Sequence, residues 1–213
     1  MNYIAERRLE EKERRRAEIL DAAEGVAAVV GWDAMTMDQV ARKARLSRAL
    51  LYVYFKDKTD LLFGVCDRAL GVLVQRFSEA VDRNKLGLDQ LAAIGRAYIA
   101  FSQEFPVYFE VVARCELLST EPQSDSNEGT AAMRGDASHA LMVQALETGV
   151  RDGSIRADVG EPGAVSVALW GFMHGVLQLA TTKANMLAHK GLSARDLVDQ
   201  AMVLATRAVA AKS

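Results

Sequence analysis

Two helix-start signals close together constrain the fold more than any other feature of this sequence. Thr36 and Gln39 fit a capping box, in which the threonine oxygen accepts a backbone N–H and the glutamine reaches back to the cap. Ser47 offers a second N-cap, and apolar residues then recur at helical spacing up to Phe55. The sequence therefore predicts two short helices joined by a tight turn around Arg45, which is a helix-turn-helix.

Basic side chains concentrate on this segment, although the whole chain has a formal net charge of -2. Between residues 42 and 58 there is a single acid, Asp57. The bases there are Arg42, Lys43, Arg45, Arg48, Lys56 and Lys58. A basic run is ordinarily a solvated helix face, but on a capped helix-turn-helix it suits the neutralisation of DNA phosphates.

The same stretch resembles the N-terminal domain of TetR-type transcriptional regulators. The matching positions, within residues 19–62, are Ile19-Leu20-Asp21-Ala22-Ala23, Gly31, Thr36, Val40-Ala41, Ala44, Leu46-Ser47, Leu51-Tyr52, Tyr54-Phe55, Lys58 and Leu61-Leu62. The resemblance implies that the helix opening at Ser47 enters the major groove of double-stranded operator DNA. The implied DNA-binding residues are Thr36, Arg45, Ser47, Arg48, Ala49, Leu50, Tyr52, Tyr54 and Lys58, of which Tyr52, Tyr54 and Lys58 touch phosphates.

Three residues depart from the family pattern. Arg45 stands where a glycine usually makes the turn, Ala49 replaces a frequent glycine, and Leu50 replaces a frequent threonine. An arginine in a left-handed turn costs on the order of 1 kcal/mol relative to glycine, so either the turn is relaxed or DNA contact offsets the strain. Leu50 either meets a thymine methyl or packs inward.

The N-terminal segment, residues 1–16, is highly charged. Glutamates and arginines recur at i, i+4 spacing, as in Glu10/Arg14 and Glu11/Arg15, which supports a helix. It lacks the apolar stretch of a secretory signal. Its arginines form either an arm that reaches a groove or part of a solvated helical extension.

The rest of the chain favours an all-α fold, because no segment shows the period-two alternation of a strand. We expect a three-helix DNA-binding domain at residues 1–58 and a larger helical ligand-binding and dimerisation domain at residues 59–213. A polar loop is expected at residues 119–129. The predicted helices of the second domain are 59–82, 87–103, 106–118, 130–151, 161–187 and 193–210.

Residues 163–182 carry no charge and are long enough to span a membrane. Projected as a helix, however, they place small residues on one face and bulky residues on the other. The small face includes Ala164, Ala168, Gly171 and Gly175. We therefore expect a helix packed on two sides by protein, and no membrane partner.

In TetR-like regulators the last two long helices build the dimer. The resemblance thus implies a homodimer with a four-helix interface from residues 161–187 and 193–210, while a seam within one chain is the alternative for the small face. The implied interface residues are Ala164, Ala168, Gly171, Gly175, Leu197, Ala201, Leu204 and Ala208.

A pocket for a small-molecule effector is also implied by the resemblance. Trp170, His174 and Gly175 match regulators that carry a tryptophan and a His-Gly pair in their ligand-binding part. The candidate ligand-binding residues are Phe101, Phe105, Tyr108, Phe109, Met133, Met142, Trp170, Met173, His174 and Gln178. Cys115 belongs to the same group of apolar residues. Aromatic residues and methionines line adaptable apolar sites, although they also fill ordinary cores.

Enzyme motifs are absent from the sequence: there is no GxxxxGK[ST], GxSxG, HExxH or CxxC. The three histidines lie far apart, and Cys66 and Cys115 lack metal-ligand spacing. We therefore expect no catalytic residue, no metal and no cofactor. Two cysteines in a chain without a signal suit a reducing cytoplasm.

The sequence thus favours a cytoplasmic DNA-binding transcriptional regulator, a repressor that a small apolar or aromatic effector releases from its operator. The alternative is a helical small-molecule-binding or scaffold protein that has lost specific DNA binding, which the changes at Arg45, Ala49 and Leu50 would explain. An enzyme is a third class and would require turnover of the bound ligand.

Overall fold

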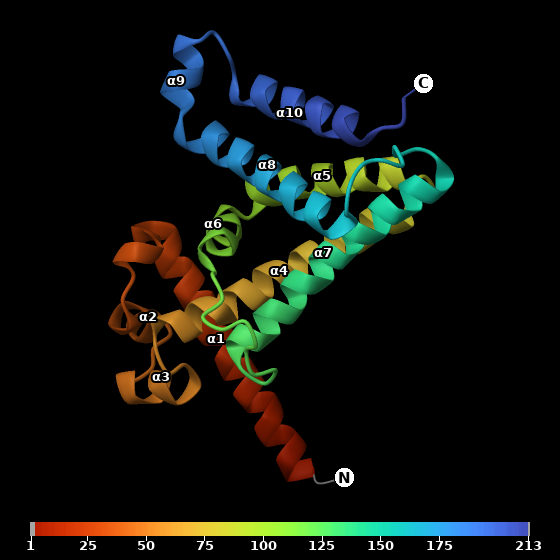
Figure 1. Cartoon of the computed structure of the whole chain (residues 1–213). Helices are drawn as coiled ribbons and strands as arrows, with labels where there is room; N and C mark the ends of the chain where they lie inside the picture. The colour runs from red at the N-terminus through yellow and green to blue at the C-terminus, as the bar shows by residue number, and fades with distance from the viewer. Residues whose placement is uncertain (1–2, 213) are drawn as a thin grey trace. The chain divides into compact units, whose positions relative to one another are not determined.

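The computed structural model describes the backbone of residues 3–212 and the side chains of residues 5–212, and its regular elements are all α-helices (Figure 1). The described residues form no strand, apart from one isolated bridge between Ile155 and Ala210. The predicted all-α class is therefore confirmed. The helices are α1 Tyr3–Ala34, α2 Met37–Lys43, α3 Arg48–Tyr54, α4 Lys58–Asp82, α5 Gly87–Glu104, α6 Pro106–Arg114, α7 Asn127–Asp152, α8 Pro162–Thr182, α9 Ala184–His189 and α10 Ala194–Val209.

The chain divides into two compact units. Unit 1 contains the residues up to 70 together with 105–133, and unit 2 contains residues 71–104 together with 134–213. The predicted domain boundary at residue 58 is a different division and stays a prediction about where the helix-turn-helix module ends.

Helix α1 extends nearly to the helix-turn-helix and bends near its end. Gly31 has φ 77° and ψ 160°, a conformation that only glycine adopts without strain. The bend lies between the long first part of α1, which contributes Ile19 and Ala23 to the core, and a last turn in which Trp32 is buried, followed by buried Met35. The N-terminal segment is thus helical from Tyr3 on, and Arg14 pairs there with Glu11 and Glu18.

The two predicted caps are both present. Thr36 accepts from the backbone of Gln39, whose side chain returns to the Thr36 backbone, and Ser47 accepts from the Leu50 N–H at 3.2 Å. Between the helices, Arg45 has φ 57° and is the one described non-glycine residue at positive φ. The turn is therefore not relaxed, and Arg45 carries its strain in the protein without DNA.

The core of unit 1 lies beneath these helices. Val40, Leu51 and Phe55 are fully buried, and the Arg16 guanidinium lies 4.8 Å from the centre of the Phe55 ring. Both α2, through Val40, and α3, through Leu51, thus contribute to this core, and α2 contacts both α1 and α3. Other fully buried side chains of this unit are Ile19, Ala23, Leu61 and Val65.

In unit 2, helix α10 packs along α8 and against α5. Glu161 caps α8 by accepting from the Gly163 and Ala164 N–H groups, and Pro162 occupies its first position. Ser193 and Asp196 form a capping box on α10. The buried side chains of this unit include Phe77, Leu91, Ile94, Tyr98, Phe101, Leu146, Ile155 and Leu177.

The prediction of one helix over residues 161–187 was wrong. The chain leaves helical geometry at Lys183, with φ -121° and ψ 33°, and a separate short helix, α9, follows. The Thr181 and Thr182 hydroxyls donate to carbonyl oxygens one turn back, at 3.1 and 2.6 Å, which weakens the helix ladder there.

Two other helix ends differ from the prediction by more than one residue. Helix α6 ends at Arg114 rather than 118, and α7 begins at Asn127 rather than 130. The polar loop is therefore ordered around the start of α7: Glu128 accepts from the backbone N–H groups of Leu118 and Ser119 at 2.6 and 3.0 Å.

Helix α8 is the one described helix whose length and composition would suffice to cross a membrane. Within unit 2 it contributes Ser166, Met173, His174, Val176 and Leu177 to the interior. One face of α8 therefore packs on protein, while the small face with Ala164, Ala168 and Gly171 is exposed, so packing on a second side stays a prediction.

We predict that Arg45→Gly raises the free energy of unfolding by about 0.5–1 kcal/mol, because glycine adopts the left-handed conformation without strain. Arg42→Gly, in the last turn of α2, should instead lower it by about 0.5–1 kcal/mol. Urea denaturation followed by circular dichroism measures both. Equal destabilisation by the two substitutions would contradict a strained turn.

Candidate nucleic-acid interface and internal cavity

The predicted DNA-binding residues lie together on the surface of the helix-turn-helix. Tyr54 and Lys58 are half-buried, and the Lys58 ammonium donates to the Asp33 carbonyl oxygen at 3.0 Å. The exposed members are Thr36, Arg45, Ser47, Arg48, Ala49, Leu50 and Tyr52. The local fold thus presents the first two turns of α3 to solvent.

Arg48 stands at the first position of α3. Its Nε lies 3.3 Å from Asp38 Oδ1, and its guanidinium lies 5.6 Å from the centre of the Tyr52 ring. The hydrogen bond with Tyr52 and the charge of Asp38 raise the pKa of Arg48. The guanidinium stays charged and accessible, but part of its charge is matched by an acid of α2.

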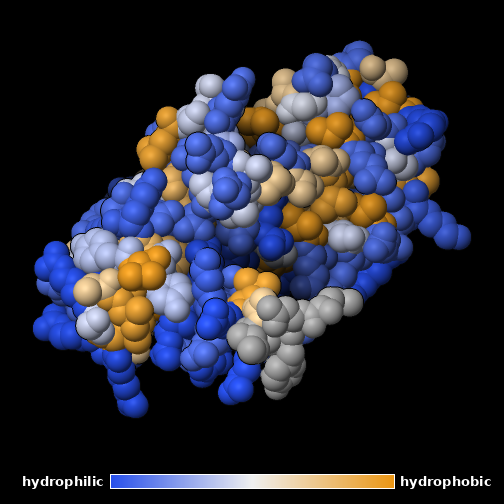
Figure 2. Space-filling view, turned by 90° about the horizontal axis from the view of Figure 1, so that it is seen from below, coloured by the Kyte–Doolittle hydropathy of each residue, from blue (hydrophilic) through white to orange (hydrophobic). Residues whose placement is uncertain are grey.

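Leu50 does not pack inward: 39% of its surface is exposed. Val53, one turn further along the same face of α3, is 77% exposed, and sequence reasoning missed it although its i, i+3 spacing to Leu50 was visible. Figure 2 shows hydrophobic side chains among hydrophilic ones on this part of the surface, at the left of the view. The exposed face of α3 therefore combines one guanidinium with two apolar side chains.

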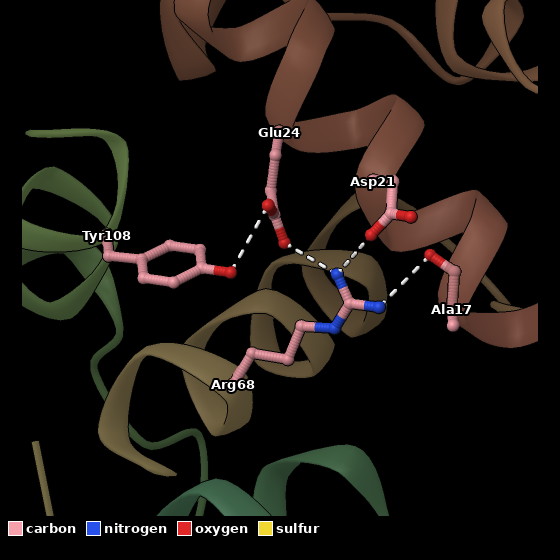
Figure 3. Close-up of polar contacts among 5 residues, drawn as sticks. All are labelled: Ala17, Asp21, Glu24, Arg68 and Tyr108. Atoms are coloured by element: carbon pink, nitrogen blue, oxygen red, sulfur yellow. Dashed lines mark hydrogen bonds and ion pairs between the residues drawn. The ribbon is translucent and has the colours of Figure 1, made fainter. Parts of the chain in front are cut away.

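Within unit 1, Arg68 of α4 forms hydrogen bonds that link α4 to α1 (Figure 3). Its Nη1 donates to Asp21 at 2.6 Å and to Glu24 at 2.9 Å, and its Nη2 donates to the Ala17 carbonyl oxygen at 3.1 Å. Tyr108 of α6 donates to the other oxygen of Glu24 at 3.2 Å. One cation thus ties α1 to α4, and one phenol ties α6 to the same carboxylate.

Burial shifts the pKa values of the side chains around Arg68. Desolvation raises the pKa of Glu24, and the hydrogen bond and charge of Arg68 offset it only in part. Desolvation also raises the pKa of Tyr108, aided by the charge of Glu24. For Arg68, desolvation acts to lower the pKa, but the bonds to Asp21 and Glu24 prevail and raise it. The Glu24 charge therefore depends on Arg68.

The predicted ligand-binding residues are divided between the two units. Phe105, Tyr108, Phe109 and Met133 belong to unit 1, and Met133 is 53% exposed. Cys115 also lies in unit 1, next to Cys66, and this neighbouring thiol, together with burial, raises the pKa of the Cys66 thiol. The members in unit 2 are Phe101, Met142, Trp170, Met173, His174 and Gln178.

Unit 2 contains a cavity of about 50 Å³. Three predicted residues line it, Met142, Trp170 and Met173, whereas Gln178 is exposed and is not part of the lining. The lining residues that the sequence reasoning missed are Phe77, Leu88, Leu91, Ala92, Ile94, Gly95, Tyr98, Leu169, Met202, Ala205 and Thr206. The helical spacing of Leu91, Ile94 and Tyr98 in α5 was the available signal.

The polar side chains around this cavity bond to one another. The Trp170 indole N–H donates to the Tyr98 hydroxyl oxygen at 3.2 Å, and the Tyr98 hydroxyl lies 2.7 Å from His174 Nδ1. Desolvation raises the pKa of Tyr98 and lowers that of His174, so both groups are neutral near pH 7. Phe101 is fully buried and stacks on the Tyr98 ring.

The residues expected at a subunit interface are mostly on the surface of unit 2. Ala164, Ala168, Gly171, Leu204 and Ala208 are exposed, while Gly175 and Leu197 are half-buried. Exposed apolar side chains on the same helices are Val167, Phe172, Leu179 and Val203. Ala201 is only 3% exposed and packs inside the unit, so it has no surface to offer to a second subunit.

No group of three or more histidine, cysteine, aspartate or glutamate residues with metal-binding geometry occurs among the described residues.

Family models match both parts of the chain. The model of bacterial regulatory proteins of the tetR family matches residues 19–65, and the tetracyclin repressor-like C-terminal domain matches residues 91–205, more than half of the chain. The chain belongs to the TetR family. The match at residues 19–65 contains the whole helix-turn-helix, and the match at residues 91–205 contains most of the cavity lining.

Curated relatives of this TetR-family chain are regulators. The transcriptional regulator HbdR of Aromatoleum sp. (strain CIB) is 32% identical over 88 residues, 41% of this chain and 38% of HbdR. The fatty acid metabolism regulator protein of Bacillus subtilis (strain 168) is 26% identical over 86 residues, 40% of this chain and 44% of that protein. The matches thus span about half or less of the relatives' length.

Solved structures share the fold of this TetR-family chain over nearly its whole length. A regulatory protein of the tetR family from Rhodococcus RHA1 has a TM-score of 0.71 at 20% identity, covering 93% of this chain and 98% of that one. The ketosteroid transcriptional regulator KstR2 of Mycobacterium tuberculosis has a TM-score of 0.67 at 19% identity, covering 93% and 96%.

We predict that Arg68→Met lowers the free energy of unfolding by about 2–3 kcal/mol, because it leaves Glu24 desolvated without its cation. Glu24→Gln alone should cost less than about 1 kcal/mol, and in its presence Arg68→Met should cost less than in the native sequence. Chemical denaturation of the four proteins of this cycle measures the coupling.

Arg76→Met provides the matched control for this cycle. Arg76 binds Glu104, whose side chain is 53% exposed, so its loss should cost about 1 kcal/mol or less. Additive effects of Arg68→Met and Glu24→Gln would show that the two residues do not support each other.

Proposed function

We propose that this chain is a cytoplasmic DNA-binding transcriptional regulator that reads its operator with α3 and releases it when a small molecule binds unit 2. The observation that carries the proposal is the doubly capped helix-turn-helix, whose second helix exposes Arg48 at its start. An exposed recognition helix places its first residues against base edges in the major groove. Membership of the TetR family supports the same reading.

The exposed face of α3 suggests a division of roles. Arg48 would donate to a guanine or a phosphate, while Leu50 and Val53 would lie against thymine methyl groups. Tyr52 and Lys58 would contact phosphates and fix the register of the helix on the duplex. The strain at Arg45 would be tolerated because its guanidinium adds a further positive charge beside the phosphate backbone of the DNA.

We infer that the protein acts as a homodimer through α8 and α10. The exposed apolar side chains of Val167, Phe172 and Leu204 and the open surface around Gly171 and Gly175 support this interface. Two subunits place two reading helices on two half-sites, which supplies affinity that one short helix cannot.

The effector would bind unit 2. A solved structure of FadR from Bacillus subtilis, with a TM-score of 0.67 at 17% identity, is described as a complex with stearoyl-CoA, so this fold accommodates a ligand in another protein. In the present chain the apolar cavity beside Tyr98 and Trp170 is the supported location. A ligand that prefers one spacing of the reading helices shifts DNA affinity by its differential binding.

Fluorescence anisotropy with DNA from the flank of the coding region tests DNA binding. Arg48→Ala and Tyr52→Ala should each weaken specific binding by about 1–3 kcal/mol. Asp38→Asn should strengthen it, because the substitution releases Arg48 and removes a negative charge near the phosphates. Affinity for the specific site should fall steeply with salt and exceed that for random DNA by about 4 kcal/mol or more.

Glu79→Gln in α4, outside the helix-turn-helix, is the control and should leave DNA affinity unchanged. Equal binding to flanking and random DNA, indifferent to Arg48→Ala and Asp38→Asn, would reject operator reading at that site. The ligand-binding or scaffold alternative would then be preferred.

Sedimentation velocity tests the interface. Val167→Glu and Leu204→Glu should each convert dimers to monomers, because a carboxylate in an apolar interface has no partner. The matched control is Leu86→Glu, an exposed leucine between α4 and α5 that should leave the dimer intact. Dimers that persist in both interface variants would place the contact elsewhere.

A further inference from the structure

The cavity in unit 2 has a predominantly apolar lining. Among the described residues that line it there is no acid, base or amide side chain. Its polar side-chain groups are the Tyr98 hydroxyl, the Trp170 indole N–H and the Thr206 hydroxyl, and the first two bond to each other. A carboxylate or phosphate placed here would lose its hydration without gaining a cation, which costs several kcal/mol. The lining therefore selects uncharged ligands.

The volume of the cavity, about 50 Å³, is too small for such a ligand as it stands. A cavity of about 150 Å³ accepts benzene, and drug-sized ligands need several hundred. A ligand must therefore displace part of the lining. The rigid aromatic rings cannot yield easily, because Tyr98 is held between Trp170 and His174.

Met202 of α10 is the lining residue that can yield. A methionine has three rotatable side-chain bonds and fills irregular gaps. Met142 and Met173 are 7% and 6% exposed and enclosed in the core, whereas Met202 is half-buried, so part of its side chain already reaches solvent. Its Sδ and Cε lie 3.0 Å from the point that a Cβ on Gly95 would occupy. The thioether thus fills space that α5 leaves open only because residue 95 is glycine.

We propose that the Met202 side chain occupies part of a binding site for a compact, uncharged, apolar ligand of about one or two aromatic rings. The ligand enters by displacing the thioether from Gly95 and then packs against Trp170, Tyr98 and Phe77. The inference rests on the proposed effector function of unit 2, which it narrows to one ligand class and one moving residue.

Calorimetric titration of the full chain without DNA tests the proposal, with indole as the probe and benzoate as its charged counterpart. Met202→Ala should bind indole about tenfold more tightly than the native chain, since no side chain has to be displaced. Met202→Leu keeps the volume but stiffens the side chain, and should bind indole more weakly than the native chain. Benzoate should bind none of these proteins.

Met186→Ala is the matched control, because Met186 is 41% exposed in α9 and does not line the cavity. It should leave the indole affinity unchanged. With ¹³C-methyl-labelled methionine, indole should shift the resonance that is missing from Met202→Leu and leave the Met186 resonance in place. This second readout decides the matter even where Met202→Ala fails to fold.

Indole affinity that is equal in the native chain, Met202→Ala and Met202→Leu, or benzoate binding as tight as indole binding, would overturn the proposal. Because no DNA is present, the result is separate from operator reading. If the protein binds indole as described but no operator, the site proposed here is supported and the proposed regulator function is rejected. If it binds an operator but no indole, only the site proposed here is rejected.

Discussion

The bonds of Arg68 hold unit 1 together below the helix-turn-helix. Its guanidinium donates to two carboxylates and one carbonyl of α1, and Tyr108 brings α6 to one of those carboxylates. Because burial makes the Glu24 charge unfavourable, each partner is needed to offset the desolvation of the others. This charged group therefore helps, together with the apolar core, to orient α1 against α4 and α6, and α2 packs on α1.

Two features suit this arrangement to a protein that must change state. The reading surface is kept in place by local caps at Thr36 and Ser47 and by the buried Phe55, so it is rigid within itself. The cavity of unit 2 is instead partly filled by a flexible methionine and lined by groups that are already bonded to one another. Rigidity where bases would be read and adaptability where a ligand would bind are what an effector-controlled regulator needs.

Much of the fold could be predicted from the sequence, because its signals are local. Both caps of the helix-turn-helix and the left-handed turn at Arg45 depend on residues within a few positions of each other. The break at Lys183 was not predicted, because threonine hydroxyls that bond back to the helix are compatible with an unbroken helix in many sequences. The two candidate sites differ in the same way. The exposed face of α3 follows from spacing within one helix, whereas the cavity lining depends on which side chains of several helices meet.

The sequence by itself determined the helices, their caps and the basic helix-turn-helix, since capping, periodicity and charge are properties of neighbouring residues. Only the tertiary structure decided which distant side chains meet. It assigned Phe105, Tyr108 and Phe109 to unit 1 and Trp170 and Met173 to unit 2, it turned Ala201 inward, and it placed Met202 against Gly95. These outcomes depend on how helices far apart in the sequence pack, and each helix face could satisfy its own periodicity in several packings.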